Sequence, residues 1–116
     1  MSAEMIKYPF GPQTHVVKDV ATGDVDVTIV NSLTSIDLKT TQATGNRTLN
    51  LTIDTGVPYG SEISIACKSD GTETLIAGTG CQFVTLTGVA GKTFIYTLRY
   101  NQTIGKFVVI SSIQND

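Results

Sequence analysis

The sequence predicts an all-β fold, an antiparallel β-sandwich or jelly-roll-like domain with an extended N-terminal arm. Three observations support this prediction. The chain is rich in Thr, and a β-branched side chain fits the pleated surface of a strand. Apolar and polar residues alternate with a period of two from Asp24 onward, whereas a helix would need a period of 3.6. Turn-forming residues separate these runs at spacings of roughly eight to twelve residues, as in sandwiches and small barrels.

The alternation locates the expected strands. Val25, Val27 and Ile29 form the first apolar face, with polar residues between them. Three further apolar sets repeat this spacing: Ile36 and Leu38; Leu49, Leu51 and Ile53; and Ile63, Ile65 and Cys67. Shorter strands are expected around residues 74–77 and 82–87. A closing hairpin is expected from residues 93–100 and 106–112, so the chain should contain seven or eight strands.

Turn chemistry separates the expected strands. Asp70 and Gly71 both tolerate positive φ, so this step favours a hairpin between the strands on either side of it. Gly78-Thr79-Gly80 and Gly88-Val89-Ala90-Gly91 mark further breaks, and Asn101–Gly105 is the expected loop of the closing hairpin.

The first 20 residues differ from the rest, which divides the chain into an arm (1–20) and a β domain (21–116). Tyr8-Pro9-Phe10-Gly11-Pro12 combines two aromatic rings with two prolines, which lack the backbone donor that a sheet needs. Two interpretations stay open at this point. The segment is either a flexible terminus or an arm whose aromatic side chains become buried against a partner.

Composition excludes several classes of function. The chain has 116 residues, which suits one domain, and 16% of them are charged, with a net charge of −2. Its eight Lys and Arg residues are scattered, so no nucleic-acid partner is expected. No apolar run is long enough for a membrane helix, and the first ten residues lack the apolar core of a secretory signal. We therefore expect synthesis in a cytoplasm and no membrane partner.

Cys67 and Cys81 are open to three interpretations. A cytoplasm keeps thiols reduced, which favours two buried free thiols. A disulfide between them is the second interpretation. A metal site is the third and the weakest, because His15 is the only His and no CxxC pair is present. We expect no cofactor.

No catalytic constellation is apparent, so we expect no enzymatic activity. The segment Gly88–Thr93 ends in Gly-Lys-Thr, but a phosphate-binding loop needs a further Gly where Leu86 stands, and a strand pattern follows instead of a helix. His15 has no neighbouring nucleophile in the sequence. Asp24 and Asp26 alternate with apolar residues, so they should lie on the outer face of a strand, where charge protects an edge from stray pairing.

The last expected strand has apolar residues on both faces. Val108 and Ile110 point one way, and Phe107 and Val109 point the other. A short chain has few elements to cover both faces, so we expect a homo-oligomer in which another copy supplies the cover.

An ordered series of turn and strand segments suggests a family. The segments are Gly45–Leu51, Val57–Ile65, Ser69–Thr72, Gly78–Gly80, Leu86–Thr93 and the hairpin from Tyr100 to Phe107. In this order and spacing, residues 44–110 resemble the head-fibre and capsid-decoration proteins on the virions of tailed bacteriophages. The resemblance implies a compact, non-enzymatic β domain, often trimeric, held on the capsid exterior through an N-terminal segment.

From this resemblance we expect a virion structural protein on the capsid exterior, with the capsid protein as its partner and a homotrimer as its assembly. The expected capsid-binding residues are Tyr8, Pro9 and Phe10. One alternative is a carbohydrate- or receptor-binding β-sandwich module of a virion appendage, in which Tyr59 or Tyr100 would contact the sugar. Another is a bacterial β domain with a scaffolding role.

Overall fold

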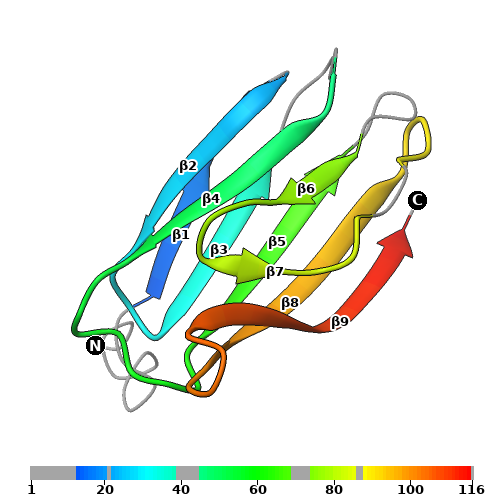
Figure 1. Ribbon diagram of the computed structural model, residues 1–116. Coiled ribbons are helices and arrows are strands. Elements are labelled where there is room, and N and C mark those ends of the chain that lie inside the picture. Colours follow the sequence, from blue (N-terminus) through cyan, green and yellow to red (C-terminus); the bar gives the residue numbers. More distant parts are fainter. Residues whose placement is uncertain (1–12, 21, 39–44, 69–73, 86–87, 116) are drawn as a thin grey trace, which may run out of the picture.

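The computed structural model describes residues 13–20, 22–38, 45–68, 74–85 and 88–115, and it confirms the all-β prediction (Figure 1). Nine strands and no helix occur in these residues. The strands are β1 (Gln13–Val17), β2 (Gly23–Ile29), β3 (Leu33–Leu38), β4 (Arg47–Ile53), β5 (Glu62–Lys68), β6 (Leu75–Ala77), β7 (Cys81–Gln82), β8 (Thr93–Asn101) and β9 (Lys106–Asn115).

The strands form two layers, and the first six alternate between them. A six-stranded sheet has the order β1-β3-β5-β8-β9-β7, and a three-stranded sheet has the order β2-β4-β6. Figure 1 shows the smaller sheet lying over β1, β3 and β5 of the larger one. Strands β1, β3 and β5 are parallel to one another, as are β2, β4 and β6. The first part of the chain therefore winds like a short solenoid.

This winding corrects the expected antiparallel sandwich or jelly roll. Consecutive strands from β1 to β6 lie in different sheets, so each of β1 to β4 pairs with the next strand but one along the chain. Ile36, for example, is the register partner of Ile65, and Val27 is the partner of Leu51. A parallel pair needs a crossover connection, and here the crossover is a strand of the other sheet. The prediction of a hairpin at Asp70-Gly71 is wrong for the same reason. Residues 69–73 lie outside the described part, but their flanking strands β5 and β6 belong to different sheets.

The antiparallel prediction holds only at the C-terminal end. β5 pairs with β8, and β8 and β9 form the expected closing hairpin. Asn101 shapes its loop, because its backbone carbonyl accepts from Gly105 N at 2.8 Å and its side-chain Oδ1 accepts from Ile104 N at 3.0 Å. Gly105 has φ +74°, a conformation that suits glycine. A bulge leaves Ile110 as the extra residue of β9, opposite the Thr97–Leu98 step of β8.

The segment from β6 to β7 joins the two sheets along one side. Gly78 N donates to Leu49 O at 2.9 Å, and Leu51 N donates to Thr79 O at 2.7 Å, so the segment follows β4. Phe107 N donates to Gly80 O at 3.0 Å on its other side. The strand expected over residues 82–87 is confined to β7, because residues 83–85 form no strand. On the opposite side of the molecule, β1 and β2 are the outer strands of their sheets.

The core fills the space between the layers with the inward faces that the alternation predicts. Its fully buried members include Val25, Ile29, Ile36, Leu38, Leu49, Ile63, Ile65, Leu98 and Phe107. Of the three buried polar residues in the described part of the chain, Arg47 is the charged one, and its side chain is only 1% exposed. Residues 13–17, inside the range expected as the arm, form β1 and pair in parallel with β3. Any truncation of the arm that preserves this sheet must therefore end before Gln13.

Candidate functional site

The structure separates the residues that sequence analysis singled out. The expected capsid-binding residues Tyr8, Pro9 and Phe10 lie outside the described residues. Cys67 and Cys81 are free thiols, and both are buried. Burial raises the pKa of both thiols above the usual value, and for Cys67 the nearby Arg47 guanidinium opposes that rise. Both cysteines therefore act as small core residues.

The polar residues considered for chemistry lie apart from one another. His15 is exposed on β1, and Asp24 and Asp26 are exposed on β2. Asp26 Oδ1 accepts a hydrogen bond of 3.2 Å from Asn50 Nδ2 on the neighbouring strand. Within the described ranges, no group of three or more His, Cys, Asp or Glu side chains is arranged to hold a metal ion.

Three aromatic rings form a line at one end of the molecule. The ring of Tyr59 contacts that of Tyr100, with a centroid distance of 4.8 Å and an interplanar angle of 41°. Tyr100 in turn stacks on Phe107 at 5.1 Å and 16°. Phe107 is fully buried, whereas 56% of Tyr59 is exposed. The line therefore runs from the core to solvent and ends in an aromatic ring supported on one side.

A tight turn holds Tyr59 over Tyr100. Ser61 N donates to Pro58 O at 3.2 Å, and Gly60, the third residue of this turn, has φ +92°, as the third position of a type II turn requires. The turn is also tied to the end of β8. Gly60 N donates to Tyr100 O at 2.9 Å, and Tyr100 N donates to Ser61 O at 2.8 Å. These bonds extend the β5–β8 ladder by one step and position the Tyr59 ring.

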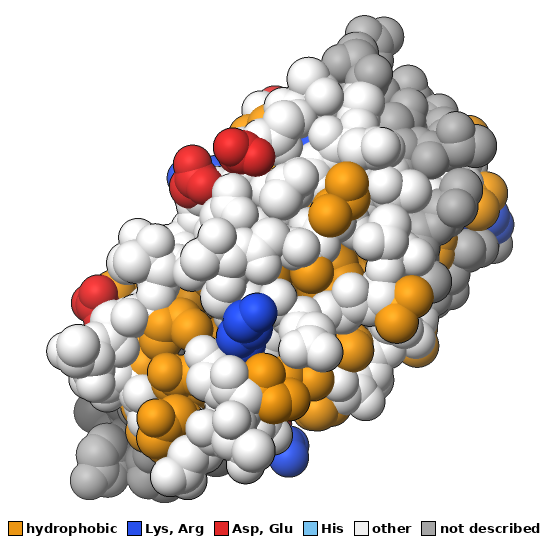
Figure 2. Space-filling model, in the orientation of Figure 1, with side chains coloured by type: hydrophobic (Ala, Val, Ile, Leu, Met, Phe, Trp, Pro, Cys, Tyr) orange, Lys and Arg blue, Asp and Glu red, His pale blue; other side chains and the backbone are white. Residues whose placement is uncertain are grey.

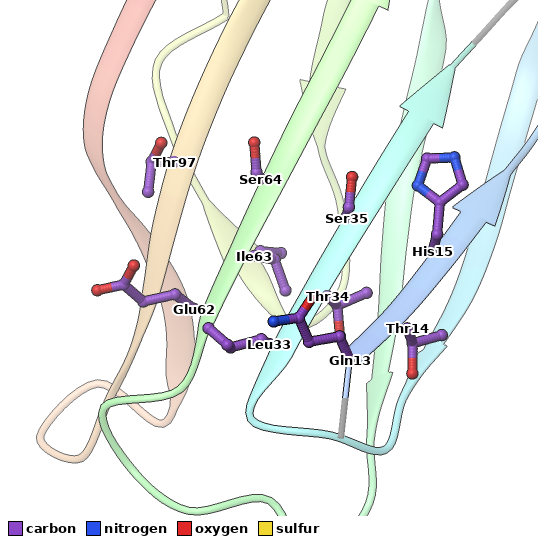
Figure 3. Close-up of a pocket in the computed structure, with 10 residues that line it drawn as sticks. All are labelled: Gln13, Thr14, His15, Leu33, Thr34, Ser35, Glu62, Ile63, Ser64 and Thr97. Atoms are coloured by element: carbon purple, nitrogen blue, oxygen red, sulfur yellow. The ribbon is translucent and has the colours of Figure 1, made fainter. Parts of the chain in front are cut away.

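Two hollows meet beside this turn. The smaller, of about 420 Å³, is lined by Ser32, Leu33, Pro58, Tyr59, Gly60, Ser61 and Glu62. The larger, of about 580 Å³, lies on the outer face of the six-stranded sheet across β1, β3, β5 and β8 (Figure 3). Leu33 and Glu62 line both hollows. The surface is therefore continuous from Tyr59 onto the sheet.

A row of polar side chains crosses the larger hollow. Register pairing aligns His15 with Ser35, Ser35 with Ser64, and Ser64 with Thr97. Figure 3 shows these four side chains, which we call the polar row, side by side on four neighbouring strands. Three of the four side chains carry hydroxyl groups, which both donate and accept hydrogen bonds. The row is therefore suited to a ligand rich in hydroxyl groups.

An ion pair borders the hollow on the β8 side. Arg99 Nη2 lies 2.8 Å from Glu62 Oε2, and Arg99 Nε donates to the same oxygen at 3.3 Å. The Arg99 side chain is 54% exposed and that of Glu62 is 38% exposed, so water screens the pair and it adds at most about 1 kcal/mol to stability. The main consequence of the pair is that Arg99 balances the charge of Glu62, which is the one carboxylate among the residues that line the hollow.

Among the described residues, five of the eight large hydrophobic side chains that are exposed lie in the C-terminal third of the chain. They are Val84, Val89, Ile104, Ile110 and Ile113, each at least 43% exposed. In Figure 2, hydrophobic side chains lie both over the β6–β7 region and at the lower left of the view, and acidic side chains lie over β2. The sequence prediction of two apolar faces on the last strand is thus matched by Phe107 in the core and Ile110 half in solvent.

Tyr59 and Tyr100 were predictable from the sequence as candidate sugar contacts, but the polar row was not. Alternation places Ser35, Ser64 and Thr97 on outward faces, but only the pairing of β3, β5 and β8 brings them into line. Neither the protein-family models nor the curated proteins include a match to this chain. In the described residues, no helix has the length and apolar character to cross a membrane.

Proposed function

We propose that this chain is a non-enzymatic structural protein of a phage virion, a head-fibre or decoration protein that assembles as a homotrimer on the capsid exterior. The observation that best supports this proposal is the exposed apolar surface of β9. Ile110 and Ile113 are 50% and 55% exposed, and the pairing of β9 with β7 ends at Val108. Among the described residues, no strand pairs with this edge of β9 beyond Val108. An unpaired edge that also carries exposed apolar side chains favours association.

Solution mass tests the assembly. A monomer has a mass of 12.3 kDa, so a trimer would give three times this value, roughly 37 kDa, by light scattering. Replacing Ile113 with Lys should lower the observed mass toward that of the monomer. Val30→Lys is the matched control, because Val30 is 49% exposed but follows β2, far along the chain from β9. A monomeric wild-type protein would contradict the proposal.

The N-terminal segment is the proposed anchor, with Tyr8, Pro9 and Phe10 contacting the capsid protein. A variant lacking residues 1–12 keeps β1 intact and should retain its oligomeric mass. It should no longer co-sediment with purified capsids of the source phage. Normal co-sedimentation of this variant would show that the anchor lies elsewhere.

A second candidate function is carbohydrate or receptor binding by the same virion appendage. The observation that favours it is the exposed Tyr59 ring supported by Tyr100. A rigid exposed aromatic ring suits stacking against the C–H face of a sugar. Binding that is lost in Tyr59→Ala but kept in Tyr59→Phe would support this function.

A further inference from the structure

The hollow on the larger sheet has the dimensions of an extended ligand site. Neighbouring strands lie about 4.8 Å apart, so the polar row from His15 to Thr97 covers about 14 Å across four strands. Gln13, Leu33 and Glu62 form a second row beside it, again by register. The two rows offer donors and acceptors along a line rather than around a single point.

Within the described ranges, the side chains of the polar row make no hydrogen bond to other side chains or to the backbone. Ser35 and Ser64 are exposed on the outer face of the sheet, and His15 and Gln13 are exposed at its β1 edge. Exposed hydroxyl groups exchange water for a ligand at little cost, provided that the ligand supplies both donors and acceptors. Sugar hydroxyl groups supply both.

The charge of the hollow favours an uncharged ligand. Of its ten lining residues, only Glu62 is acidic, and it is paired with Arg99. None of the ten is Lys or Arg, so no basic cluster is present to attract a phosphate, sulfate or carboxylate group. Apolar contact comes from Leu33 and, across the shared boundary, from the Tyr59 ring.

From these features we infer that a linear, uncharged oligosaccharide lies along the polar row and ends on Tyr59. The inference rests on the second candidate function, because it assigns that function a site and a ligand class. One sugar ring stacks on the free face of Tyr59. The following rings pass Glu62 and Leu33 and donate to and accept from Ser64, Ser35 and His15.

The test titrates the full-length chain with maltohexaose, cellohexaose and chitohexaose by calorimetry, with dextran sulfate as the charged comparison. At least one neutral hexasaccharide should bind. A Ser35→Ala, Ser64→Ala variant should weaken that binding about five- to tenfold, as expected for two lost hydrogen bonds. Ser111→Ala is the matched control, because Ser111 is exposed and pairs with Thr97 but does not line the hollow. Tyr59→Ala should weaken binding at least tenfold, and Tyr59→Phe should not.

The outcomes separate this inference from the function on which it rests. Binding that depends on Tyr59 but is unchanged in the Ser35→Ala, Ser64→Ala variant would support the carbohydrate function. It would overturn the inference that the oligosaccharide lies along the polar row. If the chain binds dextran sulfate more tightly than the neutral hexasaccharides, the inference that the ligand is uncharged is overturned. No binding of any hexasaccharide at millimolar concentration overturns both the inference and the second candidate function.

Discussion

Arg47 Nη2 donates a hydrogen bond of 3.1 Å to Cys67 Sγ, and this bond links the smaller sheet to the larger one through the core. The same nitrogen donates to Lys68 O at 2.8 Å, and Nη1 reaches Val20 O at 3.4 Å. The acceptors in the described residues are thus two carbonyls and a thiol, and Nε lacks a partner there. Arg47 therefore ties together β4, β5 and the segment before β2.

Arg47→Ala should lower the free energy of unfolding by about 2–4 kcal/mol, because it leaves a cavity and removes the donors for three acceptors. Arg47→Met should cost less, since it fills most of the volume without burying a charge. Urea unfolding measures both values. An Ala variant as stable as the wild type would show that the guanidinium does not hold the sheets together.

Stability should fall as the pH rises above about 9. Burial raises the pKa of Cys67 and Cys81 above the ordinary value of 9.0, so the folded chain keeps protons that the unfolded chain releases. Each thiol then contributes a loss of at most about 1.4 kcal/mol per pH unit between the unfolded and folded pKa values. Burial also raises the pKa of Tyr96 from 10.0 to about 12, which extends the loss to higher pH.

Urea unfolding at a series of pH values measures this dependence. A variant with Cys67→Ala and Cys81→Ala is less stable at neutral pH but should show a flatter profile between pH 9 and 10. A profile as steep as that of the wild type would assign the loss to other groups.

Gly80→Ala should be strongly destabilising, because two effects coincide at this position. Gly80 has φ +78°, and an added Cβ would lie 2.4 Å from the Leu51 carbonyl oxygen. Gly105→Ala is the matched control, since Gly105 has φ +74° but open space around it. The control should cost about 1–2 kcal/mol from the backbone conformation alone, and Gly80→Ala should cost clearly more. Equal melting temperatures would contradict the close approach of this segment to β4.

Asp24 and Asp26 should protect the exposed edge of β2 from pairing with other chains. Among the described strands, β2 is an outer strand that pairs with β4 alone, and both carboxylates are exposed along it. A variant with Asp24→Asn and Asp26→Asn should aggregate several-fold faster at 37 °C, as followed by light scattering. The control carries Asp19→Asn and Asp54→Asn, which remove the same net charge from exposed positions outside the strands. Equal aggregation rates would attribute the effect to net charge alone.

The location and burial of most strands were predictable because alternation depends only on local geometry. Leu49 and Leu51 face the core, with Thr48 and Asn50 on the other side, as the period of two requires. The outward placement of Asp24 and Asp26 and the loop of Asn101–Gly105 were predicted for the same reason. β1 escaped prediction because its pattern is weak, and its residues are at most partly buried.

The sequence alone therefore determined that the chain is all-β, which residues of most strands face the core, and where the final hairpin turns. Tertiary structure decided which strands are neighbours, because the same alternation suits a hairpin partner or a parallel partner some 20–30 residues away. That choice made the winding parallel, buried Arg47 between the sheets and aligned His15, Ser35, Ser64 and Thr97. The polar row exists only through this pairing, since its members are separated along the chain and meet across hydrogen-bonded strands.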